Sequence, residues 1–291
     1  MLFHQPRNDF SPKYYLRYVF SIFAKFVFFS AIFCVLRCWL QLFYCIMMKA
    51  MILAAGLGTR LKPFTDKHPK ALAKVNGESL LALNIKYLQQ FGIFDVVVNV
   101  HHFAEQIEEE IANNKGWGSN VIISDERAEV LETGGGLKKA IPLLRDSADI
   151  LVMNVDILSN IDLHKMLVHH QASGADVTLA VQERVSSRYF LFIPEGEYLR
   201  LAGWRHAGTE EEKLPCPHPA PLQALAFSGI QIVKSSFLPK INLTGKFSLV
   251  DVYLSLCCQE KIYAWNHTGD LLLDVGKPES LARAAQLFNR G

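Results

Sequence analysis

The feature of this sequence that most restricts its fold is an apolar segment, residues 50–55, that runs directly into a loop with two glycines. An unbroken apolar run is expected of a strand that is buried on both faces, as strands are in a parallel sheet. Gly56 and Gly58 allow the backbone to approach a ligand closely and to direct its N–H groups at phosphate oxygens. The segment therefore predicts a central strand of an α/β sheet that ends in a phosphate-binding loop.

The residues after the glycines exclude two familiar nucleotide-binding loops. A dinucleotide-binding fingerprint needs a third glycine and an immediate helix, whereas Pro63 and Pro69 prevent a helix here. A P-loop ends in Gly-Lys-Ser or Gly-Lys-Thr, and this loop does not. What remains is a long loop that carries Arg60, Lys62 and Lys70, and both residue types bind phosphate. A solvated basic loop is the alternative interpretation, and it suits Lys62 and Lys67 best.

Alternating strands and helices follow in the first half of the chain. The expected strands are residues 50–55, 95–100, 121–124 and 150–155, and the expected helices are 79–91, 105–113, 137–144 and 163–171. Such an alternation predicts the α/β fold class, with a three-layer α/β/α architecture, a mostly parallel sheet and right-handed crossovers.

The second half is expected to contain more strands than helices. The expected strands are residues 177–182, 189–193, 199–204, 226–233 and 262–266, and the expected helices are 250–257 and 278–288. A segment rich in Glu, Pro and His, residues 205–223, is expected to be an exposed loop. We interpret residues 48–291 as one domain whose first half (48–175) binds a nucleotide and whose second half (176–291) binds the partner substrate.

The loop also belongs to a longer pattern, Gly56-x-Gly58-Thr59-Arg60-Leu61-x-Pro63-x-Thr65 followed by Pro69-Lys70. This pattern resembles the signature of the nucleotidyltransferases that activate sugar 1-phosphates. The likeness extends over nearly all of residues 48–291, and it points to the branch of N-acetylmuramate-1-phosphate uridylyltransferases and mannose- or heptose-1-phosphate guanylyltransferases. The resemblance implies a Rossmann-like, GT-A-like nucleotidyltransferase fold, a nucleoside triphosphate and a sugar 1-phosphate as substrates, and Mg²⁺ as cofactor. It identifies neither the sugar nor the base.

Two aspartates are the candidate ligands of Mg²⁺, which prefers hard oxygen ligands. Asp156 follows an apolar strand, where ligands gather in open α/β sheets. In the family this Asp usually follows a glycine, and here Val155 stands in that place. The resemblance makes Asp274 the second ligand, at the end of another short apolar run. For both acids, capping of a nearby helix is the alternative, although Asp162 is better placed than Asp156 to cap the helix at 163–171.

The resemblance also implies roles for residues in both halves of the chain. Arg60 and Lys70 would be the catalytic cations. The implied nucleotide-binding residues are Ala54, Ala55, Gly56, Gly58, Thr59, Glu132, Gly134 and Gly135. The glycine cluster at 132–136 would leave bare backbone for the base and ribose, or it is simply a flexible helix start. The implied sugar-phosphate residues are Glu183, Arg188 and Gly229. Arg188 contacts phosphate or is merely exposed, and both interpretations stay open.

Three further residues carry weaker signals. Asp251, at the start of an expected helix, could bind substrate or cap that helix. His101 and His102 resemble a metal pair, but adjacent residues of a strand point to opposite faces. We therefore expect these histidines to be structural or to line the pocket.

Residues 1–47 form a hydrophobic extension that differs from the rest of the chain. Every window of membrane-spanning length in it contains a charge, and Arg37 near the middle would cost roughly 2.5–3.5 kcal/mol on insertion. The extension also runs into the expected central strand without a polar linker. We expect a start-site artefact, with the chain beginning at Met47 or Met48; a membrane-associating helix and a soluble extra helix are less favoured alternatives.

The overall composition excludes some function classes. A formal net charge of +2 and the lack of a long basic run argue against nucleic acid as a partner. Cys216, Cys257 and Cys258 fit no zinc or disulfide spacing, so we expect unpaired thiols and the cytoplasm. Nothing in the pattern predicts an oligomeric state.

The resemblance leaves competing classes to weigh. A non-catalytic sugar-nucleotide-binding regulatory protein with the same fold is one alternative, but it would be expected to lack a loop cation or a metal carboxylate. The prolines after the glycine loop argue against a nicotinamide oxidoreductase. We expect a metal-assisted displacement without a covalent enzyme intermediate.

Overall fold

The computed structural model describes residues 48–217 and 221–287, which belong to a compact unit comprising residues 45–291. The interpretations of residues 1–47 lie outside the described residues. In the first half the elements are β1 (Lys49–Leu53), β2 (Lys74–Val75), β3 (Glu78–Ser79), α2 (Leu80–Gln89), β4 (Asp95–Val100), α3 (Ala104–Asn113), β5 (Asn120–Asp125), α4 (Glu132–Leu144), β6 (Asp149–Asn154), β7 (Ile157–Ser159) and α5 (Leu163–Ser173).

The second half contains more strands than helices, as expected. Its elements are β8 (Val177–Gln182), β9 (Arg188–Glu195), β10 (Tyr198–His206), β11 (Glu212–Lys213), β12 (Gln223–Lys234), α6 (Leu249–Leu256), β13 (Ile262–Asn266), β14 (Leu272–Asp274) and α7 (Pro278–Leu287). Short 3₁₀ turns are η1 (Thr59–Leu61), η2 (Phe64–Asp66), η3 (Lys70–Leu72), η4 (Lys115–Gly118) and η5 (Ser235–Lys240). None of the described helices is long and apolar enough to span a membrane.

One ten-stranded sheet organises the described residues, in the order β11-β10-β13-β8-β12-β6-β1-β4-β5, with β9 paired to both β10 and β12. Strands β6, β1, β4 and β5 run parallel, as predicted. Strand β12, however, is antiparallel to both β6 and β8, and β9, β10 and β11 also pair antiparallel. The first half of the sheet is therefore parallel as predicted, whereas the second half is mixed. Strands β8 and β13 pair parallel, and the antiparallel pairs follow from the β9–β10 hairpin that precedes β12.

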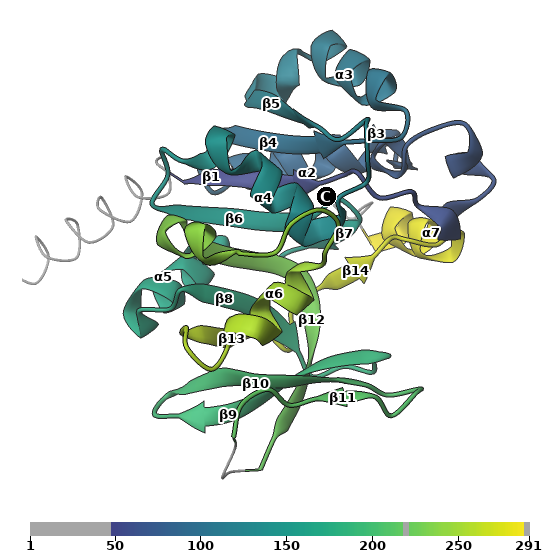
Figure 1. Ribbon diagram of the computed structural model, residues 1–291. Helices are drawn as coiled ribbons and strands as arrows, with labels where there is room; N and C mark the ends of the chain where they lie inside the picture. Colours follow the sequence, from purple (N-terminus) through teal and green to yellow (C-terminus); the bar gives the residue numbers. More distant parts are fainter. Residues whose placement is uncertain (1–47, 218–220, 288–291) are drawn as a thin grey trace, which may run out of the picture. The chain divides into compact units, whose positions relative to one another are not determined.

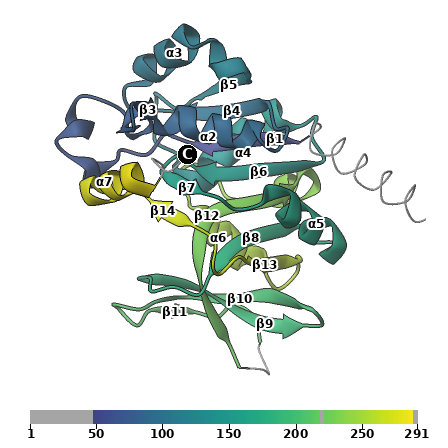
Figure 2. The same ribbon diagram turned by 180° about the vertical axis from the view of Figure 1, so that it is seen from behind.

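Helices cover both faces of the sheet because successive side chains of a strand point in opposite directions. Ala50 and Ile52 pack in an apolar cluster with α2, α3, α5 and α7, whereas Met51 and Leu53 pack in a second cluster with α4 and α6. The opposite views in Figures 1 and 2 show α4 and α6 in front of one face and α2 and α5 in front of the other. The three-layer α/β architecture is confirmed.

The ends of the elements have local causes. The Ser79 hydroxyl accepts a hydrogen bond from the Ala82 N–H at 3.2 Å and caps α2. The Asp162 carboxylate accepts from the Lys165 N–H at 3.1 Å and caps α5. A cap satisfies one of the amides that a helix start leaves unpaired. Asp162 therefore fills the capping role that was the alternative for Asp156.

The largest difference from the predicted elements is the start of α4, which begins at Glu132 and not at residue 137. Glycine costs about 1 kcal/mol in a helix relative to alanine, so the glycine cluster did not predict helix. Close packing of these glycines against residues 245–248, which a larger side chain would prevent, offsets this cost. The predicted exposed loop at 205–223 likewise contains a short strand, β11, which pairs with β10.

The cysteine prediction is wrong. Cys216 and Cys258 form a disulfide, and Cys257 is a free, buried thiol. The pairing links positions 42 residues apart in sequence, a separation that no local spacing rule detects. The prediction of a reducing compartment therefore loses its basis in unpaired thiols.

Candidate active site

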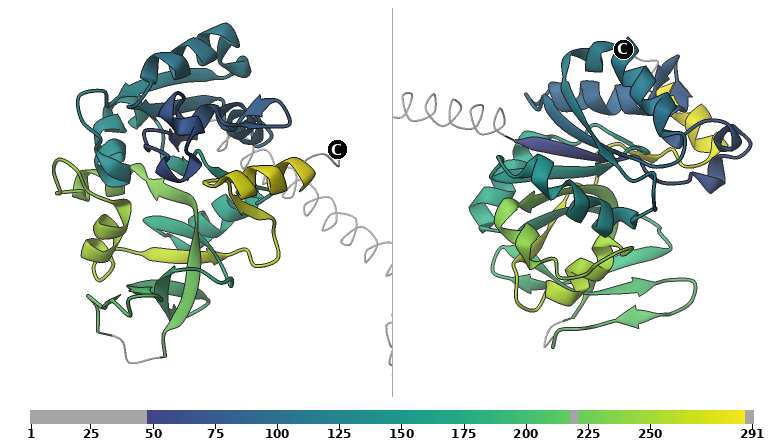
Figure 3. Two further views of the ribbon diagram at one scale, coloured as in Figure 1. Left: turned by 90° about the vertical axis from the view of Figure 1, so that its right-hand side faces the viewer. Right: turned by 45° about the horizontal axis from the view of Figure 1, so that its top comes forward.

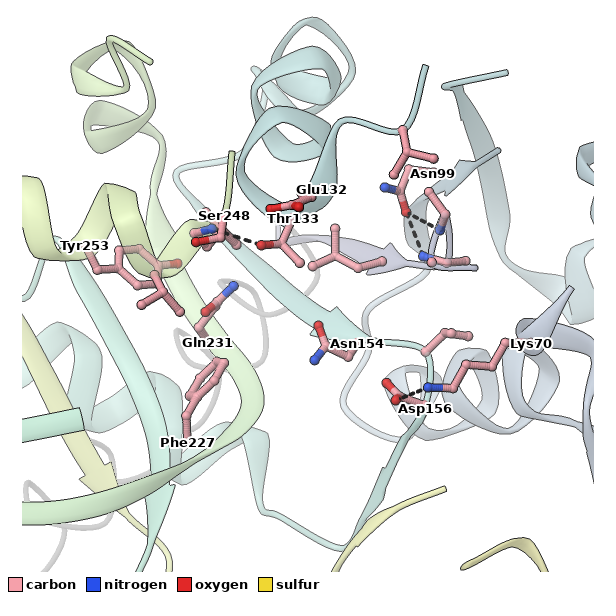
Figure 4. Close-up of a pocket in the computed structure, with 18 of the residues that line it drawn as sticks. Lys70, Asn99, Glu132, Thr133, Asn154, Asp156, Phe227, Gln231, Ser248 and Tyr253 are labelled. Atoms are coloured by element: carbon pink, nitrogen blue, oxygen red, sulfur yellow. Dashed lines mark hydrogen bonds and ion pairs between the residues drawn. The ribbon is translucent and has the colours of Figure 1, made fainter. Parts of the chain in front are cut away.

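A cavity of about 470 Å³ opens at the carboxyl end of β1, next to the loop that follows it. Both halves of the domain contribute to its wall, as Figure 4 shows. The lining residues are Leu53, Ala54, Ala55, Gly56, Lys70, Asn99, Val130, Glu132, Thr133, Asn154, Val155, Asp156, Arg188, Phe190, Phe227, Gln231, Ser248, Leu249, Val250 and Tyr253. This is the crevice at the carboxyl edge of an open α/β sheet where ligands are expected.

Lys70 and Asp156 form an ion pair in the wall of this cavity (Figure 4). Lys70 begins η3 in the loop after β1, and Asp156 follows β6, the parallel neighbour of β1. Their side chains are only 11% and 15% exposed, so the pair is shielded from most of the solvent. Such shielding strengthens an interaction between charges relative to bulk water.

A second ion pair lies next to the first and joins Arg60 to Asp274, with 3.7 Å between Nη2 and Oδ2. Strand β14 pairs antiparallel with β7, which places Asp274 opposite Ile157. The Val275 N–H donates to the Asp156 carbonyl at 2.8 Å. These backbone contacts bring the backbones of Asp156 and Asp274 close together, whereas neither Arg60 nor Asp274 is among the residues that line the cavity.

Gly276 makes room for the Arg60–Asp274 pair. A Cβ atom at this position would lie 2.7 Å from Arg60 Nη2 and 2.8 Å from Asp274 Oδ1. The Gly276 N–H also donates to Asp274 Oδ1 at 2.9 Å. Asp274 therefore accepts a hydrogen bond in the turn before α7 and also pairs with Arg60. Figure 3 shows α7 (yellow) beside the loop that follows β1 (purple).

The two loop glycines have different structural roles. Gly58 adopts a left-handed conformation with φ of 61°, and a Cβ there would lie 2.9 Å from Thr65 Cγ2 and 3.0 Å from Lys70 Cβ. Gly58 thus lets the loop fold tightly enough to position Lys70. Gly56 borders the cavity, and a Cβ there would meet nothing within 4 Å. Thr59 begins η1 without lining the cavity, and the predicted absence of an α-helix here is confirmed.

Asn99 is a site residue that sequence reasoning missed. Its Oδ1 accepts the amide hydrogens of Ala54 at 2.6 Å and Ala55 at 3.3 Å, so it holds the end of β1 in place. Its Nδ2 donates to Glu126 Oε1 at 2.8 Å, and burial raises the pKa of that carboxyl. The only available signal was one polar residue among the valines of β4.

The glycine cluster at the start of α4 mainly contacts protein. The amides of Gly134 and Gly135 donate to the Phe247 carbonyl at 3.0 and 3.2 Å. A Cβ at Gly134 would lie 2.5 Å from the Phe247 ring, and one at Gly135 would lie 2.4 Å from the Gly245 carbonyl. Glu132 and Thr133 line the cavity, whereas neither of these two glycines does. The glycines therefore let α4 approach residues 245–248 closely.

Two polar atoms in the part of the cavity wall formed by β12 and α6 lack hydrogen-bond partners among the described residues. They are Gln231 Oε1, on β12, and the Tyr253 hydroxyl, on α6. Figure 4 shows both side chains at the cavity, together with Phe227, which lies on β12 as Gln231 does. A buried polar group without a partner costs about 1–3 kcal/mol, so both atoms are suited to a ligand that supplies the missing bond. Sequence reasoning missed both residues.

Of the three predicted sugar-phosphate residues, Arg188 lines the cavity, and Glu183 and Gly229 do not. Glu183 is exposed, and its N–H donates to Thr268 Oγ1 at 2.8 Å. Gly229 has φ of 73°, and a Cβ there would lie 3.0 Å from Asn154 Nδ2. This glycine therefore leaves room for the side chain of Asn154, which lines the cavity.

The weaker candidates have structural partners. The Asp251 N–H and carboxylate both bond to the Ser248 hydroxyl, which identifies Asp251 as part of the cap of α6. His101 Nδ1 lies 2.7 Å from the Glu126 carbonyl oxygen, which agrees with the expected structural role.

A basic glycine loop at the carboxyl edge of an open α/β sheet, with Asp156 after β6 and Asp274 on the adjoining two-stranded sheet, suits an enzyme that acts on phosphate groups. Residues 49–194 match the family model described as nucleotidyl transferase. The chain belongs to this family, and it is a nucleotidyltransferase.

Relatives and solved structures resemble most of the chain. The N-acetylmuramate alpha-1-phosphate uridylyltransferase of Neisseria meningitidis serogroup B is 31% identical over 245 residues, which cover 82% of this chain and 98% of the relative. The D-glycero-alpha-D-manno-heptose 1-phosphate guanylyltransferase of Aneurinibacillus thermoaerophilus is 28% identical over 239 residues, 81% and 96% of the two chains. The crystal structure of HddC from Yersinia pseudotuberculosis complexed with GMP-PN shares the fold, with a TM-score of 0.63, 22% identity, and coverage of 82% and 99%.

Proposed function

We propose that this enzyme transfers a uridylyl group from UTP to N-acetylmuramate 1-phosphate, or to a related hexose 1-phosphate, with the help of Mg²⁺. The products are a UDP-sugar and pyrophosphate. The observation that carries the proposal is the Lys70–Asp156 ion pair in the cavity wall, with the Arg60–Asp274 pair beside it. The likeness to the Neisseria uridylyltransferase over 98% of that protein supports the choice of base and sugar. Because UTP is made and used in the cytoplasm, the proposed reaction favours that compartment.

The two carboxylates suit a magnesium ion. Asp156 and Asp274 supply hard, anionic oxygen donors from adjacent strand ends, and such donors are what Mg²⁺ prefers. Each carboxylate is now balanced by a cation of the loop that follows β1. When bound, the ion would neutralise phosphate charge and polarise the phosphate oxygens.

The two loop cations, Arg60 and Lys70, would bind the phosphate groups of both substrates. Arg60, 54% exposed, can turn from Asp274 toward the β- and γ-phosphates and hold the leaving pyrophosphate through paired N–H donors. Lys70 would bind the α-phosphate and the incoming sugar phosphate as a point charge. Gly56 leaves open space for a phosphate against bare backbone. The chain thus supplies positioning and charge neutralisation, which dominate phosphoryl and nucleotidyl transfer.

The substrates would occupy different parts of the cavity. The base and ribose would lie near Glu132 and Thr133, at the start of α4. The sugar would lie near Gln231 and Tyr253, whose unpartnered oxygens can bond hydroxyl or amide groups. Arg188, an exposed cation of the wall, would approach the sugar phosphate.

Guanylyl transfer to a mannose or heptose 1-phosphate is the second candidate. It is supported by the 28% identity to the heptose 1-phosphate guanylyltransferase over 96% of that protein. None of the described cavity contacts is specific to one base, so the two candidates differ only in the relatives that support them.

Pyrophosphate release tests the proposal. UTP, GTP, CTP, dTTP and ATP are each combined with N-acetylmuramate 1-phosphate, glucose 1-phosphate, mannose 1-phosphate, a heptose 1-phosphate and phosphocholine, with and without Mg²⁺. We expect the highest kcat/KM for UTP with N-acetylmuramate 1-phosphate, and no turnover without the metal. A preference for GTP with mannose or heptose 1-phosphate would instead establish the second candidate. Activity with none of these pairs would contradict both.

A further inference from the structure

Three cysteine sulfur atoms lie together outside the active site. Cys216 follows β11, and Cys257 and Cys258 follow α6. Their Sγ atoms all lie within 4.8 Å of one another. Cys216 and Cys258 are joined as a disulfide, while Cys216 Sγ lies 3.3 Å from Cys257 Sγ. A disulfide needs two sulfurs, so it does not account for the third.

We propose that Cys216, Cys257 and Cys258, when reduced, bind one thiophilic divalent cation such as Zn²⁺. Zinc–sulfur bonds of about 2.3 Å in a tetrahedral site place sulfurs roughly 3.8 Å apart. Cys216 Sγ and Cys257 Sγ, 3.3 Å apart, already lie within about half an ångström of that spacing, and all three sulfurs lie within 4.8 Å of one another. The bonded Cys216 and Cys258 sulfurs would move apart to this spacing once the disulfide is reduced. Cys258 is exposed, and water can therefore reach the fourth position.

Cys257 is a free, buried thiol beside the disulfide, and coordination to a cation would deprotonate it. The guanidinium of Arg200 donates to the carbonyl oxygens of Cys257 and Cys258 at 3.2 and 3.1 Å. This contact holds the end of α6 in place and sets a positive charge beside the anionic site.

The reaction balances in two steps. Reduction by a phosphine and one water molecule adds two electrons and two protons to the Cys216–Cys258 disulfide and yields two thiols; the water supplies both protons and the oxygen of the phosphine oxide. The divalent cation then displaces three protons and binds three thiolates, which gives a site of net charge −1. Oxidation reverses the first step and removes two of the three ligands.

The site would connect two segments that lead to the cavity wall. Residues 214–222 precede β12, which carries Phe227 and Gln231, and α6 carries Val250 and Tyr253. A cation would therefore join, in the reduced protein, the same segments that the disulfide joins in the oxidised protein.

The test is zinc and cobalt binding by the full chain. A variant with Cys34, Cys38 and Cys45 replaced by serine removes the cysteines that lie outside the described residues. This protein is reduced with a phosphine, titrated with Zn²⁺ or Co²⁺, desalted and analysed for bound metal. We expect one metal per chain, a thiolate-to-cobalt charge-transfer band, and a higher thermal midpoint with zinc. Excess Mg²⁺ should not compete, because it prefers oxygen ligands.

Two single substitutions in that background locate the site. Cys258→Ser changes an exposed residue and should fold normally, and Cys257→Ser keeps the disulfide pair intact. Since loss of even an outer partner costs about 10–100-fold in metal affinity, each loss of a ligand should cost at least a hundredfold. Oxidation with hydrogen peroxide should release the metal. Absence of stoichiometric binding in the reduced protein, or binding unchanged by Cys258→Ser, would overturn the proposal. Neither result depends on nucleotidyl transfer.

Discussion

Lys70 and Asp156 are 86 residues apart in sequence and form an ion pair in the wall of the cavity. The parallel register of β1 and β6 brings the ends of the two strands together, and Gly58 folds the intervening loop so that Lys70 reaches Asp156. In the proposed reaction this contact is a resting arrangement. The substrates and the metal would separate the two charges and use each of them.

Asp156→Asn should lower turnover at least about a hundredfold, a loss of roughly 2.7 kcal/mol of transition-state stabilisation. The amide keeps the size of the side chain but removes the anionic charge that a metal needs. Asp66→Asn is the matched control, because Asp66 pairs with Lys62 on the same loop but its side chain is 50% exposed. Steady-state kinetics with saturating Mg²⁺ measures both variants. Full metal-dependent activity in Asp156→Asn would refute the metal assignment.

Gly276→Ala should lower kcat/KM by roughly a hundredfold, since a displacement of about 1 Å at a catalytic group can cost that much. The added Cβ would lie 2.8 Å from Asp274 Oδ1 and displace this proposed metal carboxylate. Gly56→Ala is the comparison variant. Its added Cβ would meet no atom within 4 Å, so it should leave the midpoint of unfolding unchanged while weakening triphosphate binding at the cavity. Normal kinetics in Gly276→Ala would argue against the proposed role of Asp274.

Tyr253→Phe should raise the KM for the sugar phosphate up to about tenfold, because one hydrogen bond contributes roughly 0.5–1.5 kcal/mol. The KM for the triphosphate and the stability should hardly change, since the hydroxyl has no partner among the described residues. Tyr263→Phe is the control: its hydroxyl donates to Glu195 Oε1 at 2.8 Å, away from the cavity lining. We expect the control to lose stability and keep both KM values. The reverse pattern would argue against a sugar site at Tyr253.

Stability should fall as the pH drops from about 6.5 to about 4 because of His267. Burial lowers the pKa of this imidazole to about 4 from its ordinary value of 6.5. The unfolded chain binds the proton first in that window, so stability is fully present above pH 6.5 and is lost toward pH 4, by roughly 3 kcal/mol. Urea unfolding of wild type and His267→Gln at pH 5 and 7.5 measures the effect. An equal pH dependence in the two proteins would contradict it.

Reduction of the Cys216–Cys258 disulfide in the presence of a metal chelator should lower the free energy of unfolding by roughly 4 kcal/mol. The bridge closes a loop of 42 residues, and the estimate follows from the entropy that it removes from the unfolded chain. Cys257→Ser should show the same difference, because its sulfur is not part of the bridge. Thiol counting under denaturing conditions gives the redox state for each unfolding curve. Equal stability with and without reductant would show that the bridge does not constrain the unfolded chain.

Much of the fold follows from local patterns. The apolar run at residues 50–55, the strand at 95–100 and the helix capped by Ser79 were predictable because neighbouring residues determine burial periodicity and capping. The start of α4 was not, because its glycines make sense only against Phe247 and Gly245. The antiparallel half of the sheet was also missed, since strand direction depends on how the chain returns from β10.

The site divides in the same way. Arg60, Lys70, Asp156 and Asp274 were each proposed from the sequence, because a glycine loop and acids after apolar runs are local features that resemble a known family pattern. Their pairing was decided by the register of β14 on β7 and of β1 on β6. Three further features could be seen only in the tertiary structure, because each depends on residues that are distant in sequence. They are the hydrogen bonds from the amides that follow β1 to Asn99, the unpartnered oxygens of Gln231 and Tyr253, and the cysteine cluster. The sequence by itself determined which charged groups the chain offers to the proposed reaction, and long-range packing decided which of them meet.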